Sequence, residues 1–231
     1  MKTVAIIQSN YIPWKGYFDI IHDVDEFIFL DDVQFTKQDW RSRNMIKTSQ
    51  GIKWITVPAG SDLNRLIQEV EICNSSWQKN HWMQICHSYS KAQYFDQYRD
   101  FFEDVYLHKT WKNLSEMNQY LIVCISQDIL DIKTVFSRSS DYAAEGKKQA
   151  KILDLLKKSA ADCYVSGPAA KSYIVEDDFV SAGIKLIWKD YSGYPEYSQL
   201  YPPFEHNVSI LDLLFNVGKD APYYIWGWRE S

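Results

Sequence analysis

Five short apolar runs, separated by segments of helical periodicity, restrict what this sequence can fold into. They lie at Thr3–Ile7, Glu26–Leu30, Lys133–Phe136, Asp162–Val165 and Ile184–Trp188. Short runs of this kind are typical of buried strands. Strands that alternate with helices form a largely parallel sheet. The sequence therefore predicts an α/β fold, with a mainly parallel sheet flanked by helices.

The segments between these runs carry apolar side chains at three- and four-residue spacing, which indicates helices. The expected helices are Tyr17–Val24, Trp77–Tyr89, Tyr94–Leu107, Leu114–Ile129, Lys147–Ser159, Ser172–Ala182 and Ser209–Val217. Ser75 or Ser76 is suited to cap the second helix, and Gly218 to end the last. With no clear linker, we expect a single α/β domain over residues 1–231, with a helical subdomain at residues 75–130.

Two further segments have the pattern of short strands. Asn44–Thr48 and Lys53–Val57 flank Ser49-Gln50-Gly51, which predicts an N-terminal hairpin with glycine in its turn. Leu66–Ile72 alternates apolar and polar residues and predicts another short strand. Tyr191–Phe204 is rich in Tyr, Pro and Gly and is expected to be a loop.

Composition and charge narrow the class of protein. The net charge of −5 argues against sequence-independent binding of nucleic acid, which needs a positive field. No apolar run approaches the roughly 18 residues of a transmembrane helix, and the start is too soon polar for a signal peptide. We therefore expect no membrane span and a cytoplasmic location. Aromatic residues form 16% of the chain, and this favours a ligand with flat faces, such as a sugar or a base.

Polar and aromatic side chains follow the first two strands directly, and α/β proteins bind ligands beyond the carboxyl ends of strands. A turn plus a surface loop would also supply polar groups, but such loops seldom hold large rings beside fixed charges. We therefore expect substrate binding by the following residues. They are Gln8, Tyr11, Trp14 and Tyr17 after the first strand, and Lys37, Trp40, Arg41, Arg43, Asn44 and Lys47 after the second.

The two arginines of this group are two residues apart, so in an extended segment they share a face. Guanidinium groups match the geometry of phosphate or carboxylate, and a nucleotide-sugar pyrophosphate or an acidic sugar would fit them. A solvated strand face is the alternative explanation. Trp40 and Asn44 beside the arginines favour a ligand.

Asp31 and Asp32 come directly after the second strand, where adjacent side chains point to opposite faces. We expect one carboxylate to enter the site and the other to brace the backbone or pair with arginine. Asp32 continues the parity of Ile28 and Leu30, and we expect it to be the general base. An ion pair of Asp32 with Arg41 or Arg43 is the alternative.

His81 follows Trp77 by one helical turn and is either a structural histidine or a second acid/base group. No two histidines lie four residues apart on one helix, and the four cysteines match no zinc spacing, so we expect no catalytic metal. Ser166, Gly167 and Lys171 stand between a strand and a helix, where helix N-termini bind anions. We expect these three to contact substrate.

The N-terminal motif Gln-x-x-Tyr-x-Pro-Trp-x-Gly-Tyr-Phe, running from Gln8 to Phe18, resembles the signature of the WbqC-like protein family. Further matching motifs are Asp31-Asp32, Trp40 to Asn44, Lys47, Trp77 with His81, Ser166-Gly167 with Lys171-x-Tyr173, and Ser209 to Gly218. Ser9 departs from an expected proline, and Pro168-Ala169 from expected glycines. The resemblance covers nearly the whole chain and implies a setting in bacterial O-antigen (lipopolysaccharide) and other surface-polysaccharide loci.

Three functions are compatible with these features. The first, which the resemblance favours, is a transferase that adds an acyl or aminoacyl group to the amine of a nucleotide-linked amino sugar. It would use an activated acyl or aminoacyl donor and no tightly bound cofactor. The others are a nucleotidyl-transferring α/β enzyme and a non-catalytic sugar-binding protein. The sequence does not name the sugar, the donor or the oligomeric state.

Overall fold

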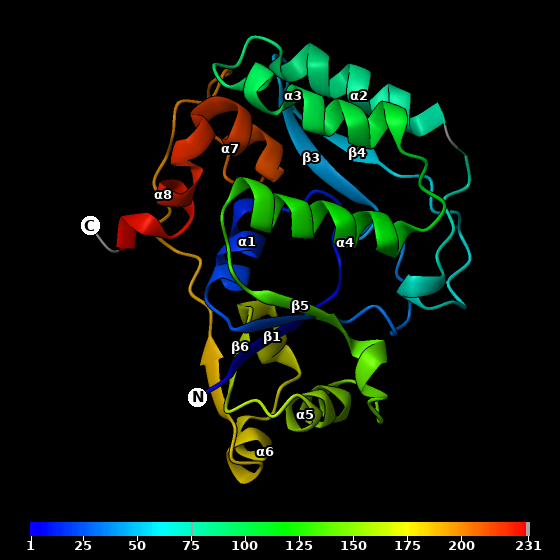
Figure 1. The fold of residues 1–231 in the computed structure, drawn as a ribbon, viewed down its shortest axis with the longest axis vertical. Coiled ribbons are helices and arrows are strands. Elements are labelled where there is room, and N and C mark those ends of the chain that lie inside the picture. The colour runs from blue at the N-terminus through cyan, green and yellow to red at the C-terminus, as the bar shows by residue number, and fades with distance from the viewer. Residues whose placement is uncertain (75, 230–231) are drawn as a thin grey trace.

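Five parallel strands form the central sheet, in the order β5-β2-β1-β6-β7, in a computed structural model that describes residues 1–74 and 76–229 (Figure 1). The strands are β1 (Thr3–Ile7), β2 (Glu26–Phe29), β5 (Val135–Arg138), β6 (Cys163–Ser166) and β7 (Lys185–Trp188). They coincide with the five apolar runs to within two residues at each end. The expected α/β fold with a mainly parallel sheet is therefore confirmed.

β1 is the central strand and pairs on both sides. Ala5 lies opposite Phe27 of β2 and opposite Val165 of β6. From β1 the chain builds first toward β5 and then returns to build toward β7. Such a reversal places the loops after the two strands at the switch on opposite sides of a crevice, where α/β proteins bind ligands.

Helices cover both faces of the sheet. They are α1 (Lys15–His22), α2 (Ser76–Tyr89), α3 (Phe95–Glu103), α4 (Leu114–Cys124), α5 (Gln149–Lys158), α6 (Glu176–Ser181), α7 (Ile210–Val217) and α8 (Ala221–Ile225). In Figure 1, α5 and α6 lie on one side of the sheet and α1 and α4 on the other. Each face buries its own alternate residues: Ile28 packs into the core with α5, and Phe27 into the core with α1 and α4.

The expected hairpin is present, as β3 (Arg43–Thr48) and β4 (Gly51–Thr56). Its turn is Ser49-Gln50, and Gly51 follows with φ of +104°, a backbone conformation that a residue with a Cβ rarely adopts. Ile46 and Ile55 of the hairpin share one hydrophobic core with residues of α2, α3, α4 and α7. The helices of residues 76–124 are therefore packed on the same core as the sheet.

Two local expectations differ from the structure. Leu66–Ile72 is not a strand; it contains a 3-10 turn at Ile67–Glu69, because Ile67 and Val70 both bury in the core at helical spacing and Glu69 accepts the Leu66 N–H. The helix expected at Ser172–Ala182 is shorter: α6 covers only Glu176–Ser181, and a 3-10 turn at Pro168–Ser172 precedes it. Ser75, one of two expected caps, lies outside the described residues.

Two of the middle helices end in a wider turn. α3 continues as a π-helical segment at Asp104–His108, and α4 continues in the same way at Ile125–Ile129. Within residues 1–74 and 76–229, the helices are all too short or too polar to cross a membrane.

Candidate functional site

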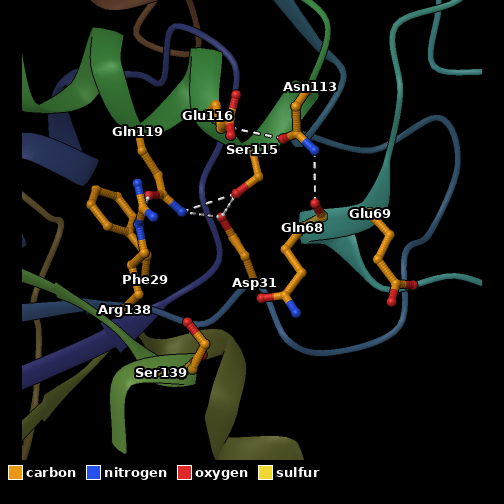
Figure 2. Close-up of a pocket in the computed structure, with 11 residues that line it drawn as sticks. Phe29, Asp31, Gln68, Glu69, Asn113, Ser115, Glu116, Gln119, Arg138 and Ser139 are labelled. Carbon is orange, nitrogen blue, oxygen red and sulfur yellow. Dashed lines mark hydrogen bonds between the residues drawn. The ribbon is translucent and has the colours of Figure 1, made fainter.

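The loop after β1 is held against the end of β2 by the buried carboxylate of Asp31, and Figure 2 shows this side chain with its partners on α4. Asp31 is 3% exposed, and its Oδ1 accepts the Ser9 N–H at 2.8 Å. Its Oδ2 accepts hydrogen bonds from the Ser115 hydroxyl and from Gln119 Nε2, both on α4. Two oxygens of a carboxylate offer about four acceptor positions, so three bonds leave room for one further donor.

An open cavity of about 250 Å³ lies beside Asp31, at the carboxyl ends of β2 and β5; we call it the acidic cavity. Figure 2 shows α4 on one side and the turn of Gln68 and Glu69 on another. Its lining residues are Phe29, Asp31, Gln68, Glu69, Asn113, Ser115, Glu116, Gln119, Arg138, Ser139 and Ser140. The lining contains three carboxylates, those of Asp31, Glu69 and Glu116, and one guanidinium, that of Arg138. Arg138 Nε donates to Gln119 Oε1 at 2.9 Å. The excess negative charge suits a ligand that carries an ammonium group.

A second cavity, of about 270 Å³, lies beyond the same loop; we call it the aromatic cavity. It is lined by Asn10, Pro13, Trp14, Trp40, Asn44 and Asn207. Indole rings with a few amide groups are typical of small-molecule sites, in which apolar surface binds the ligand and polar groups orient it. The Asn10 Oδ1 is buried and has no hydrogen-bond partner among the described residues, so the site retains an unused acceptor.

Local structure explains how Trp14 reaches this cavity. Trp14 directly precedes α1, and its ring lies over Gly16, where any Cβ would collide with the indole. The rings of Tyr191 and Tyr194 pack edge-on against it, with centroids 5.2 and 5.9 Å away. Trp14 is therefore fixed in orientation before any ligand arrives, which lowers the entropic cost of binding.

Asn44 holds the loop after β1 in shape. It is 2% exposed, and its Nδ2 donates to the carbonyl oxygens of Tyr11 at 3.0 Å and Ile12 at 2.9 Å. Ile12 has φ of +34°, which is costly for a β-branched residue. The asparagine stabilises a strained turn that aims Asn10 and Trp14 at the aromatic cavity.

The two cavities are neighbours across this loop. Ser9 binds the carboxylate that lines the acidic cavity, and Asn10, the next residue, lines the aromatic cavity. Consecutive Cα atoms are about 3.8 Å apart. The segment Ser9–Asn10 therefore contributes to both sites, and Ser9 itself is fully buried.

Of the expected substrate-binding residues, Trp14, Trp40 and Asn44 meet in the aromatic cavity. Tyr11 and Tyr17 do not, because both are core residues, 0% and 4% exposed. The Tyr17 hydroxyl donates to the carbonyl of Gln8 at 2.9 Å. Burial raises the pKa of both phenols well above the ordinary value. These tyrosines support the loop from beneath.

His81 is likewise a core residue. It is 4% exposed, its Nδ1 lies 2.8 Å from the Tyr11 hydroxyl, and Trp77 packs edge-on against its ring. Burial lowers the pKa of His81 to about 4, partly offset by a hydrogen bond to the backbone of Thr56. The structural explanation is the one that this geometry favours, since His81 lines neither cavity.

Asp31 and Asp32 point to opposite sides, and Asp31 both lines a cavity and braces the backbone of Ser9. Asp32 faces α5, where its Oδ2 lies 2.6 Å from Lys151 Nζ and its Oδ1 accepts from the Ser139 hydroxyl at 2.5 Å. The alternative pairing of Asp32 with an arginine is wrong, because Lys151 takes that place. Asp32 lines neither cavity, and its carboxylate is held in an ion pair with Lys151.

The four cationic residues expected to bind substrate do not come together in the structure. Arg41 Nη1 lies 3.2 Å from Asp39, and the guanidinium of Arg43 lies over the ring of Trp54. Lys47 is 3% exposed and its Nζ donates to Pro203 O. Lys37 is exposed. None of these four lines either cavity.

The residues expected after β6 also lie apart from both cavities. Ser166 is buried as the last residue of β6, and Gly167 faces the Tyr191 hydroxyl. Lys171 is exposed with its Nζ 5.4 Å from the Trp188 ring centroid. Gln8, expected after β1, meets Tyr17 through its backbone carbonyl. Their contact with substrate stays a prediction.

The sequence reasoning missed the polar residues of α4 and Asn207. Ser115, Asn118 and Gln119 are all at most 8% exposed, at helical spacing i, i+3 and i+4. That polar stripe beside the apolar stripe is a signal that the sequence does carry, since buried polar groups in a helix need partners. Asn207 has no such signal, because it reaches the cavity from a long loop.

Comparison with known protein families shows which family this chain belongs to. The sequence profile of the WbqC-like protein family matches residues 8–224. The chain belongs to the WbqC-like protein family. The chain is similar to "Uncharacterized protein Rv1507c" of Mycobacterium tuberculosis (strain ATCC 25618 / H37Rv). The two are 48% identical over 227 residues, which are 97% of this chain and 98% of that protein. No solved structure matches this WbqC-like protein.

Within the described part of the chain, His, Cys, Asp and Glu side chains do not gather in groups of three or more that could hold a metal ion.

Proposed function

We propose that this WbqC-like protein is a cytoplasmic transferase of bacterial surface-polysaccharide biosynthesis, which adds an acyl or aminoacyl group to the amine of a nucleotide-linked amino sugar. One observation carries the proposal. The loop after β1 contributes to two cavities: Asn10 lines a cavity of tryptophan rings and asparagine amides, and the Ser9 N–H binds the carboxylate that lines the other. Rings and amides suit a sugar, and the carboxylate suits its amine.

In this proposal the sugar ring lies between Trp14 and Trp40, and the asparagine side chains of the aromatic cavity form hydrogen bonds with its hydroxyl groups. The ammonium group reaches Asp31, which takes one proton and leaves the amine with a free electron pair. That pair attacks the acyl carbon of an activated donor, the bond to the leaving group breaks with its electrons, and the leaving group carries away the second proton that the nitrogen loses as the amide forms. Asp31 replaces Asp32 in this role, because Asp31 is the aspartate that lines a cavity.

The reaction is tested by incubating the protein with nucleotide-linked amino sugars and acyl or aminoacyl donors, and by reading product masses. We expect a mass gain on the sugar equal to the acyl group. Release of pyrophosphate would instead indicate nucleotidyl transfer. Binding without any mass change would indicate a sugar-binding protein and would refute the transferase.

The adjacent aspartates provide a matched pair of variants. Asp31→Asn should lower the rate by roughly 10²–10⁴, the usual contribution of a general base. Asp32→Asn should keep most of the rate and lose stability, because it leaves Lys151 in a half-buried position without its partner. Steady-state kinetics and thermal unfolding of both variants check this. Normal turnover in Asp31→Asn with an inactive Asp32→Asn would return the role to Asp32.

A further inference from the structure

Two tryptophans lie in contact with each other on the surface. Trp40, in the loop before β3, is 42% exposed, and Trp54, on β4, is 41% exposed. Their ring centroids are 5.3 Å apart with planes 39° apart. Single exposed apolar residues are ordinary, but adjoining exposed indoles are a feature of binding surfaces. We call Trp40, Trp54 and the adjacent Arg43 the indole platform.

Arg43 supplies positive charge to this platform. The register pairs Met45 with Trp54, so Arg43 lies diagonally across from Trp54 on the same face of the hairpin. Its guanidinium carbon is 4.2 Å from the Trp54 ring centroid. Among the described residues no carboxylate pairs with Arg43, in contrast to Arg41, which has Asp39. A guanidinium held flat against a ring, and not neutralised, is well placed for a phosphate group.

The platform is continuous with the aromatic cavity, because Trp40 belongs to both. A ligand whose sugar lies between Trp14 and Trp40 would extend, past Trp40, onto Trp54 and Arg43. The part of the ligand that follows the sugar therefore meets a flat aromatic surface and a cation. A nucleoside diphosphate has both complementary parts: a base with a π-face, and phosphate oxygens.

We propose that the indole platform binds the nucleoside diphosphate carrier of the sugar, with the base stacked on Trp54 and Trp40 and the diphosphate held by Arg43. The inference rests on the proposed function for the sugar, and it adds Trp54 as the residue that recognises the carrier. Base stacking on aromatic side chains tolerates different bases, so Arg43 and Trp54 select a nucleotide over other carriers and do not select one base.

The test is isothermal titration calorimetry with UDP, dTDP, GDP and ADP, each alone, on the wild type and on Trp54→Ala. We expect at least one nucleoside diphosphate to bind, and Trp54→Ala to weaken it about tenfold or more. Arg43→Lys keeps the charge but loses the fork and should also weaken it. Ile52→Ala is the matched control, since Ile52 is 50% exposed on the same strand and face. It should leave affinity unchanged.

Two results would overturn the inference. The first is the absence of binding by all four nucleotides. The second is equal binding by Trp54→Ala and the wild type, particularly if inorganic pyrophosphate binds as well as the nucleotides, which would indicate recognition of diphosphate alone. Thermal unfolding of each variant verifies that it is folded.

A separate readout distinguishes this inference from the proposed function. Trp14→Ala should leave the affinity for UDP unchanged, because Trp14 contacts the sugar part alone. It should lower the affinity for a UDP-linked amino sugar toward that for UDP. A further outcome is that UDP binds in a way that depends on Trp54, while the linked sugar adds no affinity and no acyl group is transferred. That result would support the indole platform as the carrier site and refute the transferase function.

Discussion

At the scale of a single residue, His81 shows how burial sets proton affinity. Its pKa in the folded protein is about 4, below the value of about 6.5 for an exposed histidine. Between these two values the unfolded chain binds a proton that the folded protein does not. Stability from the neutral imidazole is therefore complete above pH 6.5, falls as the pH is lowered, and is absent below about pH 4.

We predict that acid destabilises the protein partly through this residue. Between pH 7 and pH 5, the contribution of His81 to the free energy of unfolding should fall by roughly 2 kcal/mol. His81→Gln can still bond the Tyr11 hydroxyl but does not titrate, so its stability should depend less on pH by that amount. Denaturant unfolding of both proteins at the two pH values measures the difference. Parallel pH dependence in wild type and variant would contradict a buried neutral His81.

At the scale of an element, the end of α7 depends on the absence of a side chain. Gly218 has φ of +60° and ψ of −131°, and a Cβ there would lie 2.5 Å from the ring of Tyr94. Gly183, which ends α6, also has a positive φ of +72° but has open space around the position of a Cβ. Substituting each glycine in turn therefore distinguishes the cost of backbone strain alone, at Gly183, from the cost of strain plus steric collision, at Gly218.

We predict that Gly183→Ala lowers the free energy of unfolding by about 1 kcal/mol, the cost of a left-handed conformation for a residue with a Cβ. Gly218→Ala should cost about 3 kcal/mol or more, because strain and collision with Tyr94 add. Chemical denaturation checks both. Equal effects would indicate that Tyr94 moves aside without cost.

Also at this scale, the helices and strands were easier to predict from the sequence than the residues of the site. Apolar runs are local, and β1 was located at Thr3–Ile7, where the structure has it. Strand parity correctly separated Asp31 from Asp32. It could not tell which face carries the site, because that depends on whether α4 or α5 supplies the neighbours, and both helices follow more than 80 residues later.

The candidate site was predictable only in part for the same reason. Trp14, Trp40 and Asn44 are close in sequence and were found together, whereas Asn207 arrives from a distant loop. Tyr11 and His81 were expected in the site because their residue types suit chemistry. Their burial, however, results from packing between α2 and the loop after β1, which no local pattern reports.

At the scale of the whole molecule, a buried ionic cluster joins α1 to segments more than 160 residues away. Asp19 is 0% exposed and accepts two parallel hydrogen bonds from Arg229, each of 2.9 Å. Lys189 Nζ lies 2.8 Å from the same carboxylate, and the Tyr194 hydroxyl donates to it. The carboxylate is therefore the common partner of the residue that follows β7, of the loop after it and of the last turn described.

We predict that Asp19→Asn lowers the free energy of unfolding by about 3 kcal/mol, because it leaves Lys189 and Arg229 without their shared partner. Arg229→Gln should cost less, about 1 kcal/mol, since Arg229 is partly exposed and Lys189 still neutralises Asp19. Lys133→Gln is the control: its pair with Asp131 is about 80% exposed on both sides and should not affect stability. Unfolding in denaturant measures all three, and a neutral Asp19→Asn would refute the role of the cluster.

The position of β1 in the middle of the sheet has a consequence for how the chain folds while it is being translated. β1 leaves the ribosome before the other four strands of the sheet, but one of its two edges is completed only by Cys163–Val165, some 160 residues later. Until then the nascent chain carries a strand with an unpaired, apolar edge, the kind of edge that pairs with other chains. Final closure of the sheet therefore follows translation of β6, and until then this edge of β1 is open to pairing with other chains.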